Sequence, residues 1–109
     1  MAFTPYHNIN GATAQVNELI AINDISKDKI SSVQITNTDD AVVTIDLYIF
    51  KESTDTTASE TYYFLNTVKI PVGVSLVLDN PKVLAFDSTT FSLYIKVGAS
   101  DTVDVMIKK

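Results

Sequence analysis

The sequence predicts an all-β protein: a single antiparallel β-sandwich, jelly-roll or Ig-like, with about seven to nine short strands. Three observations favour this fold class. Apolar and polar residues alternate along most segments, as a strand with one buried face requires. Turn-forming residues interrupt these segments at intervals of roughly 8–12 residues. No segment has the apolar spacing of a long amphipathic helix.

Residues 1–11 contain Pro5 and end in Asn8-Ile-Asn-Gly11, which predicts an N-terminal arm that ends in a turn. Apolar side chains in an unstructured arm suit an arm that lies across a neighbouring subunit and folds on binding. An N-terminal strand that completes the domain's own sheet is the open alternative. Residues 12–109 then form the single sandwich domain.

Residues 31–50 show the strongest pattern, because two alternating runs flank the polar segment Asn37-Thr-Asp-Asp40. Asn and Asp side chains can hydrogen-bond to their own backbone and so initiate a turn. We therefore predict a β-hairpin here, with one dry and one wet face. The preceding segment, residues 14–22, fits a helix or a strand, and its strand-forming neighbours favour the strand.

The polar run at residues 53–61 has no apolar side chain larger than Ala, so we expect a mobile loop. Beyond it, apolar runs separated by Pro, Gly, Asn or Asp predict the remaining strands. These runs are residues 62–65, 68–70, 74–78, 83–86, 91–97 and 103–107.

The alternation also predicts which side chains face the core. On the inward faces we expect aliphatic residues and one Phe. The predicted core residues are Val33, Ile35, Val43, Ile45, Leu47, Ile49, Val74, Leu76, Leu78, Phe91, Leu93, Ile95, Val97, Val103, Val105 and Ile107.

Composition excludes several function classes. The chain of 109 residues has the length of one domain and contains no cysteine, so it forms no disulfide or thiolate metal site. Its net charge is −5, and all eight basic residues are lysines, without one arginine. Nucleic-acid binding needs clustered positive charge and favours arginine, so we expect none. No apolar run reaches the roughly 18 residues of a membrane span, and we expect neither a signal peptide nor membrane association.

Catalytic and metal-binding patterns are weak. His7 is the single histidine, and it has neither a Cys or Ser nucleophile to activate nor a second histidine with which to share a metal. Asp39 and Asp40 could join Asp101 or Asp104 around a calcium ion, but acidic residues at turns usually serve turn geometry and solubility. Glycine-rich phosphate-binding motifs are missing. We therefore expect no catalytic, metal-binding or cofactor-binding residues, and no enzyme.

Several aromatic residues fall on strand faces opposite the predicted core. Tyr48 and Phe50 alternate with the core set, Tyr94 alternates with Leu93 and Ile95, and one of Tyr62 and Tyr63 must point outward. Such residues can anchor a protein interface, pair across strands within their own sheet, or stack on sugars. The candidate interface residues are Phe3, Tyr6, Tyr48, Tyr62 and Tyr94.

Four segments resemble a group of small virion proteins of tailed bacteriophages. They are Ile30-Ser-Ser-Val-Gln-Ile-Thr-Asn-Thr38, Val43-Thr-Ile-Asp-Leu-Tyr-Ile49, Leu65 to Asp79 with its Ile-Pro-Val-Gly-Val-Ser-Leu-Val-Leu core, and Val103-Asp-Val-Met-Ile107. The similarity spans residues 19–107. It implies a β-sandwich that decorates capsids or forms neck and tail parts, without catalytic residues. The insertion at 53–61 and the aromatic segment Tyr62-Tyr-Phe64 depart from that group's pattern.

The leading hypothesis is a capsid decoration (cement) protein, made in the host cytoplasm and carried on the virion. Its partners would be the major capsid protein or other virion proteins, bound as a homo-oligomer or a multi-copy array. Two alternatives stay open: a neck, tail-adaptor or tail-fibre component, and a carbohydrate-binding or adhesin module.

Overall fold

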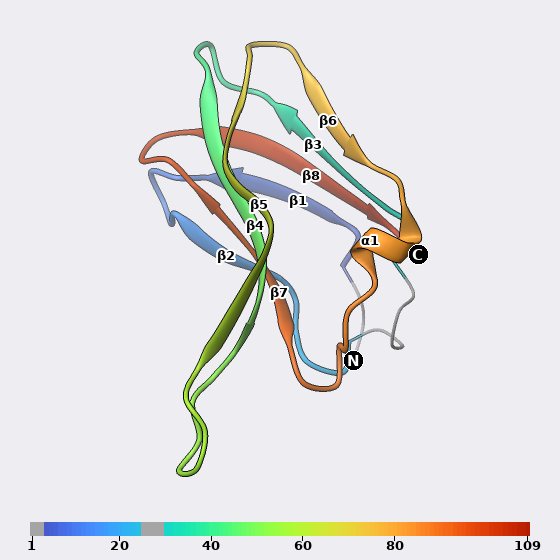
Figure 1. Cartoon of the computed structure of the whole chain (residues 1–109). Helices are drawn as coiled ribbons and strands as arrows, with labels where there is room; N and C mark the ends of the chain where they lie inside the picture. Colours follow the sequence, from blue (N-terminus) through green and yellow to red (C-terminus); the bar gives the residue numbers. More distant parts are fainter. Residues whose placement is uncertain (1–3, 25–29) are drawn as a thin grey trace.

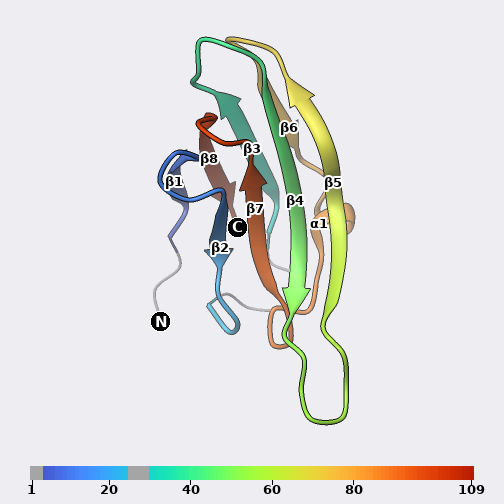
Figure 2. The same cartoon turned by 90° about the vertical axis from the view of Figure 1, so that its left-hand side faces the viewer.

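The computed structural model describes residues 4–24 and 30–109, and it consists of two antiparallel sheets packed face to face (Figures 1 and 2). The strands are β1 (Tyr6–Asn10), β2 (Val16–Ile20), β3 (Ser32–Asn37), β4 (Val43–Lys51), β5 (Glu60–Ile70), β6 (Ser75–Leu78), β7 (Ser92–Val97) and β8 (Thr102–Lys108). One short helix, α1 (Pro81–Leu84), precedes β7. The predicted all-β sandwich is confirmed.

The two sheets have the strand orders β1-β8-β3-β6 and β2-β7-β4-β5. The antiparallel pairs are nested along the chain: β4 pairs with β5, β3 with β6, β2 with β7, and β1 with β8. A long hairpin folded over on itself gives this nesting, which is the jelly-roll arrangement. The jelly roll was one of the two sandwich types that the sequence predicted.

The predicted hairpin over residues 31–50 is wrong, although both of its strands exist. β3 and β4 lie in different sheets, so residues 38–42 cross from one sheet to the other. The buried Asn37 side chain holds this crossing: its Nδ2 donates to the carbonyls of Ala41 and Ile70, both at 2.9 Å, and its Oδ1 accepts from the Asp39 N–H at 2.7 Å. The two dry faces therefore meet across the core instead of lying in one sheet.

The predicted N-terminal arm also requires correction. β1 pairs with β8 from Tyr6 opposite Met106 to Asn10 opposite Thr102, and Ile9 is only 5% exposed. Residues 6–10 are thus an edge strand of the domain, which was the open alternative. Phe3 lies outside the described residues.

Most of the predicted core is confirmed. Ile49, Leu76, Leu78 and Phe91 are half-buried against it, and the other predicted residues except Val74 are fully buried. Val74 is exposed because it closes the turn before β6, where its N–H donates to the Pro71 carbonyl at 3.2 Å. The core residues that the sequence did not predict are Ile9, Leu19, Ile20, Ile30, Ile70, Leu84 and Phe86.

Residues 81–84 form helix α1 instead of beginning the predicted strand at 83–86. Asn80 caps the helix, since its side-chain oxygen accepts from the Lys82 N–H at 3.0 Å, and Pro81 occupies the first turn. In the described part of the chain, no helix is long and apolar enough to cross a membrane.

β4 and β5 form a long hairpin that extends beyond the other strands (Figures 1 and 2). Its loop covers residues 52–59, because Glu60 and Thr61 of the predicted loop already belong to β5. Every side chain from 52 to 59 is exposed. The expected mobility of this loop remains a prediction, which amide hydrogen exchange would test.

Candidate functional site

The outer face of the β2-β7-β4-β5 sheet carries four aromatic rings in contact, which we call the aromatic row: Phe50, Tyr94, Tyr48 and Tyr63. The Tyr48 and Tyr94 rings are nearly parallel, at an 8° interplanar angle and 5.8 Å between centroids. Tyr63 lies 5.3 Å from Tyr48, and Phe50 meets Tyr94 edge-on at 6.0 Å. The row therefore crosses three adjacent strands.

Strand register brings these rings together. Tyr48 of β4 lies opposite Tyr94 of β7 on one side and opposite Tyr63 of β5 on the other. Their neighbours Leu47 and Leu93 point into the core, so the tyrosines must point outward. Tyr63 is 50% exposed, whereas Tyr48 and Tyr94 are half-buried by their neighbours. The buried parts of the aromatic row therefore pack within the sheet, and the exposed part, chiefly Tyr63, forms an apolar surface that is open to solvent.

Of the four sequence-predicted interface residues that the structure describes, only Tyr48 and Tyr94 come together. Tyr6 is 70% exposed but lies on the other sheet, opposite Met106 of β8. Tyr62 lies opposite Ile49 and contacts the Phe91 ring at 5.8 Å, while its hydroxyl donates to Glu60 Oε1 at 2.8 Å. The four described candidates therefore do not form one surface.

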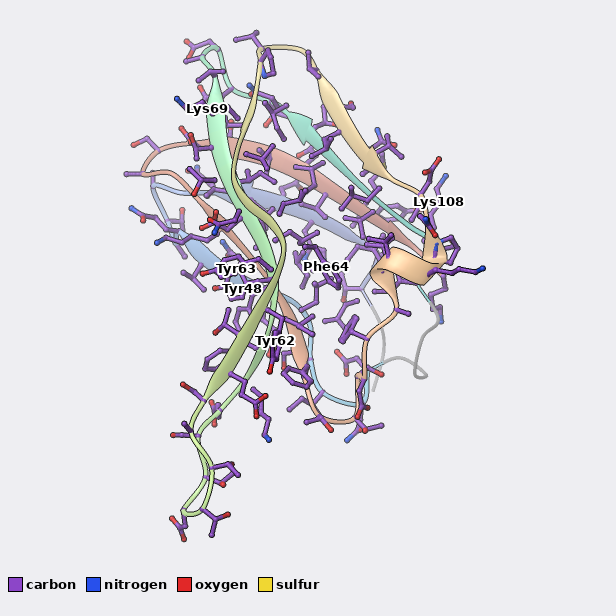
Figure 3. The ribbon with its side chains drawn as sticks, viewed as in Figure 1. Tyr48, Tyr62, Tyr63, Phe64, Lys69 and Lys108 are labelled. Atoms are coloured by element: carbon purple, nitrogen blue, oxygen red, sulfur yellow. The ribbon has the colours of Figure 1, made fainter. Side chains whose placement is uncertain are left out.

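The alternation left open whether Tyr62 or Tyr63 points outward, and the candidate set contained only Tyr62. The register between β4 and β5 shifts twice, between Ile45 and Leu47 and again between Leu47 and Tyr48, and Thr67 has a positive φ of 54°. Each bulge reverses the alternation along β5, so the two together restore it: Phe64 lies on the same face as Val68 and Ile70, and Tyr63 lies on the outer face. Figure 3 shows the result: Tyr63 lies beside Tyr48, whereas Phe64 lies on the side of the other sheet, where its ring contacts Phe86.

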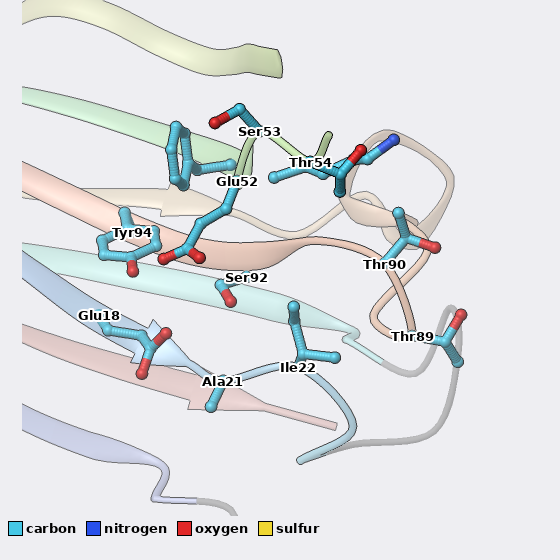
Figure 4. A pocket seen from close by; sticks show the side chains of 12 residues that line it. Glu18, Ala21, Ile22, Glu52, Ser53, Thr54, Thr89, Thr90, Ser92 and Tyr94 are labelled. Atoms are coloured by element: carbon cyan, nitrogen blue, oxygen red, sulfur yellow. The ribbon is translucent and has the colours of Figure 1, made fainter. Parts of the chain in front are cut away.

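A groove of about 650 Å³ adjoins the row where the β4–β5 hairpin leaves the sandwich (Figure 4). β2, β4, β7 and the loop before β7 supply its lining, which combines rings, carboxylates and hydroxyls. The lining includes Glu18, Ile22, Phe50, Glu52, Ser92 and Tyr94. A smaller pocket of about 200 Å³ is lined by Val16, Tyr48, Phe50 and Tyr94, and it shares Phe50 and Tyr94 with the groove.

Carboxylates lie near both stacked tyrosines of this face. Burial, the charge of Glu18, a hydrogen bond with Glu18 and the charge of Glu52 raise the pKa of Tyr94 above its usual value. Burial, followed by the proximity of Tyr63 and the Asp46 carboxylate, raises the pKa of Tyr48. Both hydroxyls therefore stay protonated at neutral pH, beside carboxylates.

The residues considered for calcium have separate structural partners. Asp101 Oδ2 accepts from the Thr44 N–H at 3.0 Å, and Asp104 Oδ1 accepts from Asn8 Nδ2 at 2.7 Å. Asp39 Oδ1 accepts from the Asp40 N–H at 2.7 Å. Within residues 4–24 and 30–109, no three His, Asp or Glu side chains form a group that could hold a metal ion.

His7, the single histidine, is the second residue of β1 and lies opposite Val105. Its Nε2 is 3.0 Å from the Thr4 carbonyl oxygen, so its contact is with the backbone of its own segment.

Comparison with protein-family models, curated proteins and solved structures finds no match to this chain. Function therefore has to be inferred from the geometry and chemistry of the site itself.

Proposed function

We propose that the protein is a non-enzymatic structural component of a tailed-bacteriophage virion, and specifically a capsid decoration protein. In this proposal it binds the assembled shell in many copies through the outer face of the β2-β7-β4-β5 sheet. The observation that carries the proposal is the aromatic row, which leaves Tyr63 half exposed beside the stacked Tyr48 and Tyr94. Interfaces concentrate their binding energy in such aromatic anchors.

Two further features support this role. The jelly roll is a common architecture of capsid proteins, although it is equally common in lectins, so the fold supports the proposal by analogy alone. A small domain with a modest binding face also suits multi-copy attachment, because many weak contacts across a repeating surface add up to strong retention. The same logic applies to a neck or tail adaptor, which is the nearest alternative.

A carbohydrate-binding or adhesin role is the second candidate. The groove is lined by the Tyr94 ring and by the side chains of Ser92 and Thr90, and sugars are bound by this combination of ring and hydroxyl groups. This alternative predicts binding to glycans in the absence of any shell.

The double variant Tyr48→Ala/Tyr63→Ala tests the proposal on capsids that lack the protein. If each ring contributes about 2 kcal/mol as an interface anchor, occupancy should require well over tenfold more protein. Tyr6→Ala is the matched control, since Tyr6 is an exposed tyrosine on the other sheet, and it should bind like the wild type. Binding is measured by co-sedimentation, and circular dichroism establishes that each variant is folded at the assay temperature.

Unchanged binding by the folded double variant would contradict the proposed face. If the wild-type protein does not bind capsids but does bind a glycan array, the adhesin role would replace the decoration role.

A further inference from the structure

We propose that the groove beside the aromatic row receives an arginine side chain from the partner protein. This inference specifies the partner of the proposed binding face, and it therefore rests on the proposed function. Three observations support it: two carboxylates in the groove that have no ion-pair partner among the described residues, the rings beside them, and the composition of the chain.

The first property is charge. Glu18 of β2 and Glu52, the first residue of the β4–β5 loop, both line the groove, and Figure 4 shows both carboxylates on the side of Tyr94. Lys51 also lines the groove, but its Nζ pairs with Glu60 Oε2 at 3.3 Å. Two carboxylates that face one space repel each other, and a bound cation offsets that repulsion.

The second property is the surrounding apolar surface. The rings of Phe50 and Tyr94 form one wall, and Ala21 and Ile22 form another. A guanidinium group is planar, can stack on an aromatic ring, and can donate to two carboxylates at once. Its methylene stem packs against apolar side chains while the head remains solvated. Arginine fits this combination better than lysine, whose ammonium group is a point charge.

The third property identifies the source of the side chain. The sequence contains no arginine, so a second copy of this chain cannot supply one. The net charge of −5 also favours approach to a basic surface. A different protein with an exposed arginine is therefore the occupant that the groove selects.

Titration of the isotope-labelled protein with the peptide acetyl-Gly-Arg-Gly-amide tests the inference by NMR. We expect saturable shifts in the signals of Glu18, Glu52, Ser92 and Tyr94. Acetyl-Gly-citrulline-Gly-amide has nearly the same shape without the charge, and it should bind about tenfold more weakly or not at all. High salt should weaken binding of the arginine peptide.

The double variant Glu18→Gln/Glu52→Gln should lose the response to the arginine peptide. Asp55→Asn/Asp79→Asn is the matched control, because it changes the net charge equally at exposed positions outside the groove, and it should respond like the wild type. An equal response to the citrulline peptide, a response retained in the Glu18→Gln/Glu52→Gln variant, or saturation of the groove by a neutral oligosaccharide would overturn the inference.

This experiment is independent of capsid binding. Failure of the peptide titration with intact capsid binding would overturn the arginine site alone. Failure of capsid binding with a positive titration would overturn the decoration role and leave the arginine site supported.

Discussion

Leu93→Ala is expected to lower the free energy of unfolding by about 2–5 kcal/mol. Leu93 is only 1% exposed and lies on β7, which is paired on both sides, with β2 and β4. Its neighbours are held in paired strands and cannot collapse into the cavity that the substitution creates. Ile45→Ala on β4 should have an effect of the same size, for the same reason.

Denaturant-induced unfolding monitored by circular dichroism measures this effect. Val77→Ala is the control, because Val77 is 49% exposed on the edge strand β6, and it should cost less than about 0.5 kcal/mol. Losses below about 0.5 kcal/mol at both Leu93 and Ile45 would mean that the inner and outer faces are assigned the wrong way round.

Gly11→Ala is expected to destabilise the protein by about 3 kcal/mol or more. Gly11 is buried where the β1–β2 connection packs on the β7–β8 connection, and its N–H donates to the Asp101 carbonyl at 2.7 Å. A Cβ at this position would overlap the Gly98 carbonyl oxygen and lie 3.1 Å from Ser100 N. The obstacle is backbone, and Gly98 N–H is itself bonded to the Thr44 carbonyl at 3.1 Å, so it cannot move freely.

Gly73→Ala provides the comparison. Gly73 has a positive φ of 73°, but nothing lies within 4 Å of the position that its Cβ would take. This substitution should therefore cost only the conformational strain, about 1 kcal/mol. Thermal unfolding of both variants separates the steric clash at Gly11 from the conformational strain at Gly73. A Gly11→Ala variant at least as stable as Gly73→Ala would contradict the described packing of the β1–β2 connection on the β7–β8 connection.

Local periodicity made the strand faces predictable, but it could not show which strands pair. Alternating residues on either side of a polar turn look the same whether the turn closes a hairpin or crosses between sheets. What decides the case at residues 38–42 is the contact of Asn37 with the Ile70 carbonyl, 33 positions away in the sequence. The strand predicted at residues 83–86 is wrong for another reason. The apolar run there resembles a strand, but the capping residue Asn80, which lies before the run, starts a helix.

The candidate site was predictable only residue by residue. The outward direction of Tyr48 and Tyr94 followed from alternation with their buried neighbours, and the structure confirms it. The alternation left open whether Tyr62 or Tyr63 points outward, and the pairing of Tyr63 with Tyr48 decides it. The groove was not predictable at all, because Glu18, Glu52 and Ser92 come from strands and loops that are distant in the sequence.

The central claim is that the outer face of the β2-β7-β4-β5 sheet is the surface that binds the shell. Hydroxyl-radical footprinting of the protein, free and in virions, read out by mass spectrometry, tests it most directly. Tyr63 and Tyr6 are both well exposed in the free protein and lie on different sheets. The account predicts strong protection of Tyr63 on virions with Tyr6 still reactive. Protection of Tyr6 with Tyr63 still reactive would contradict it.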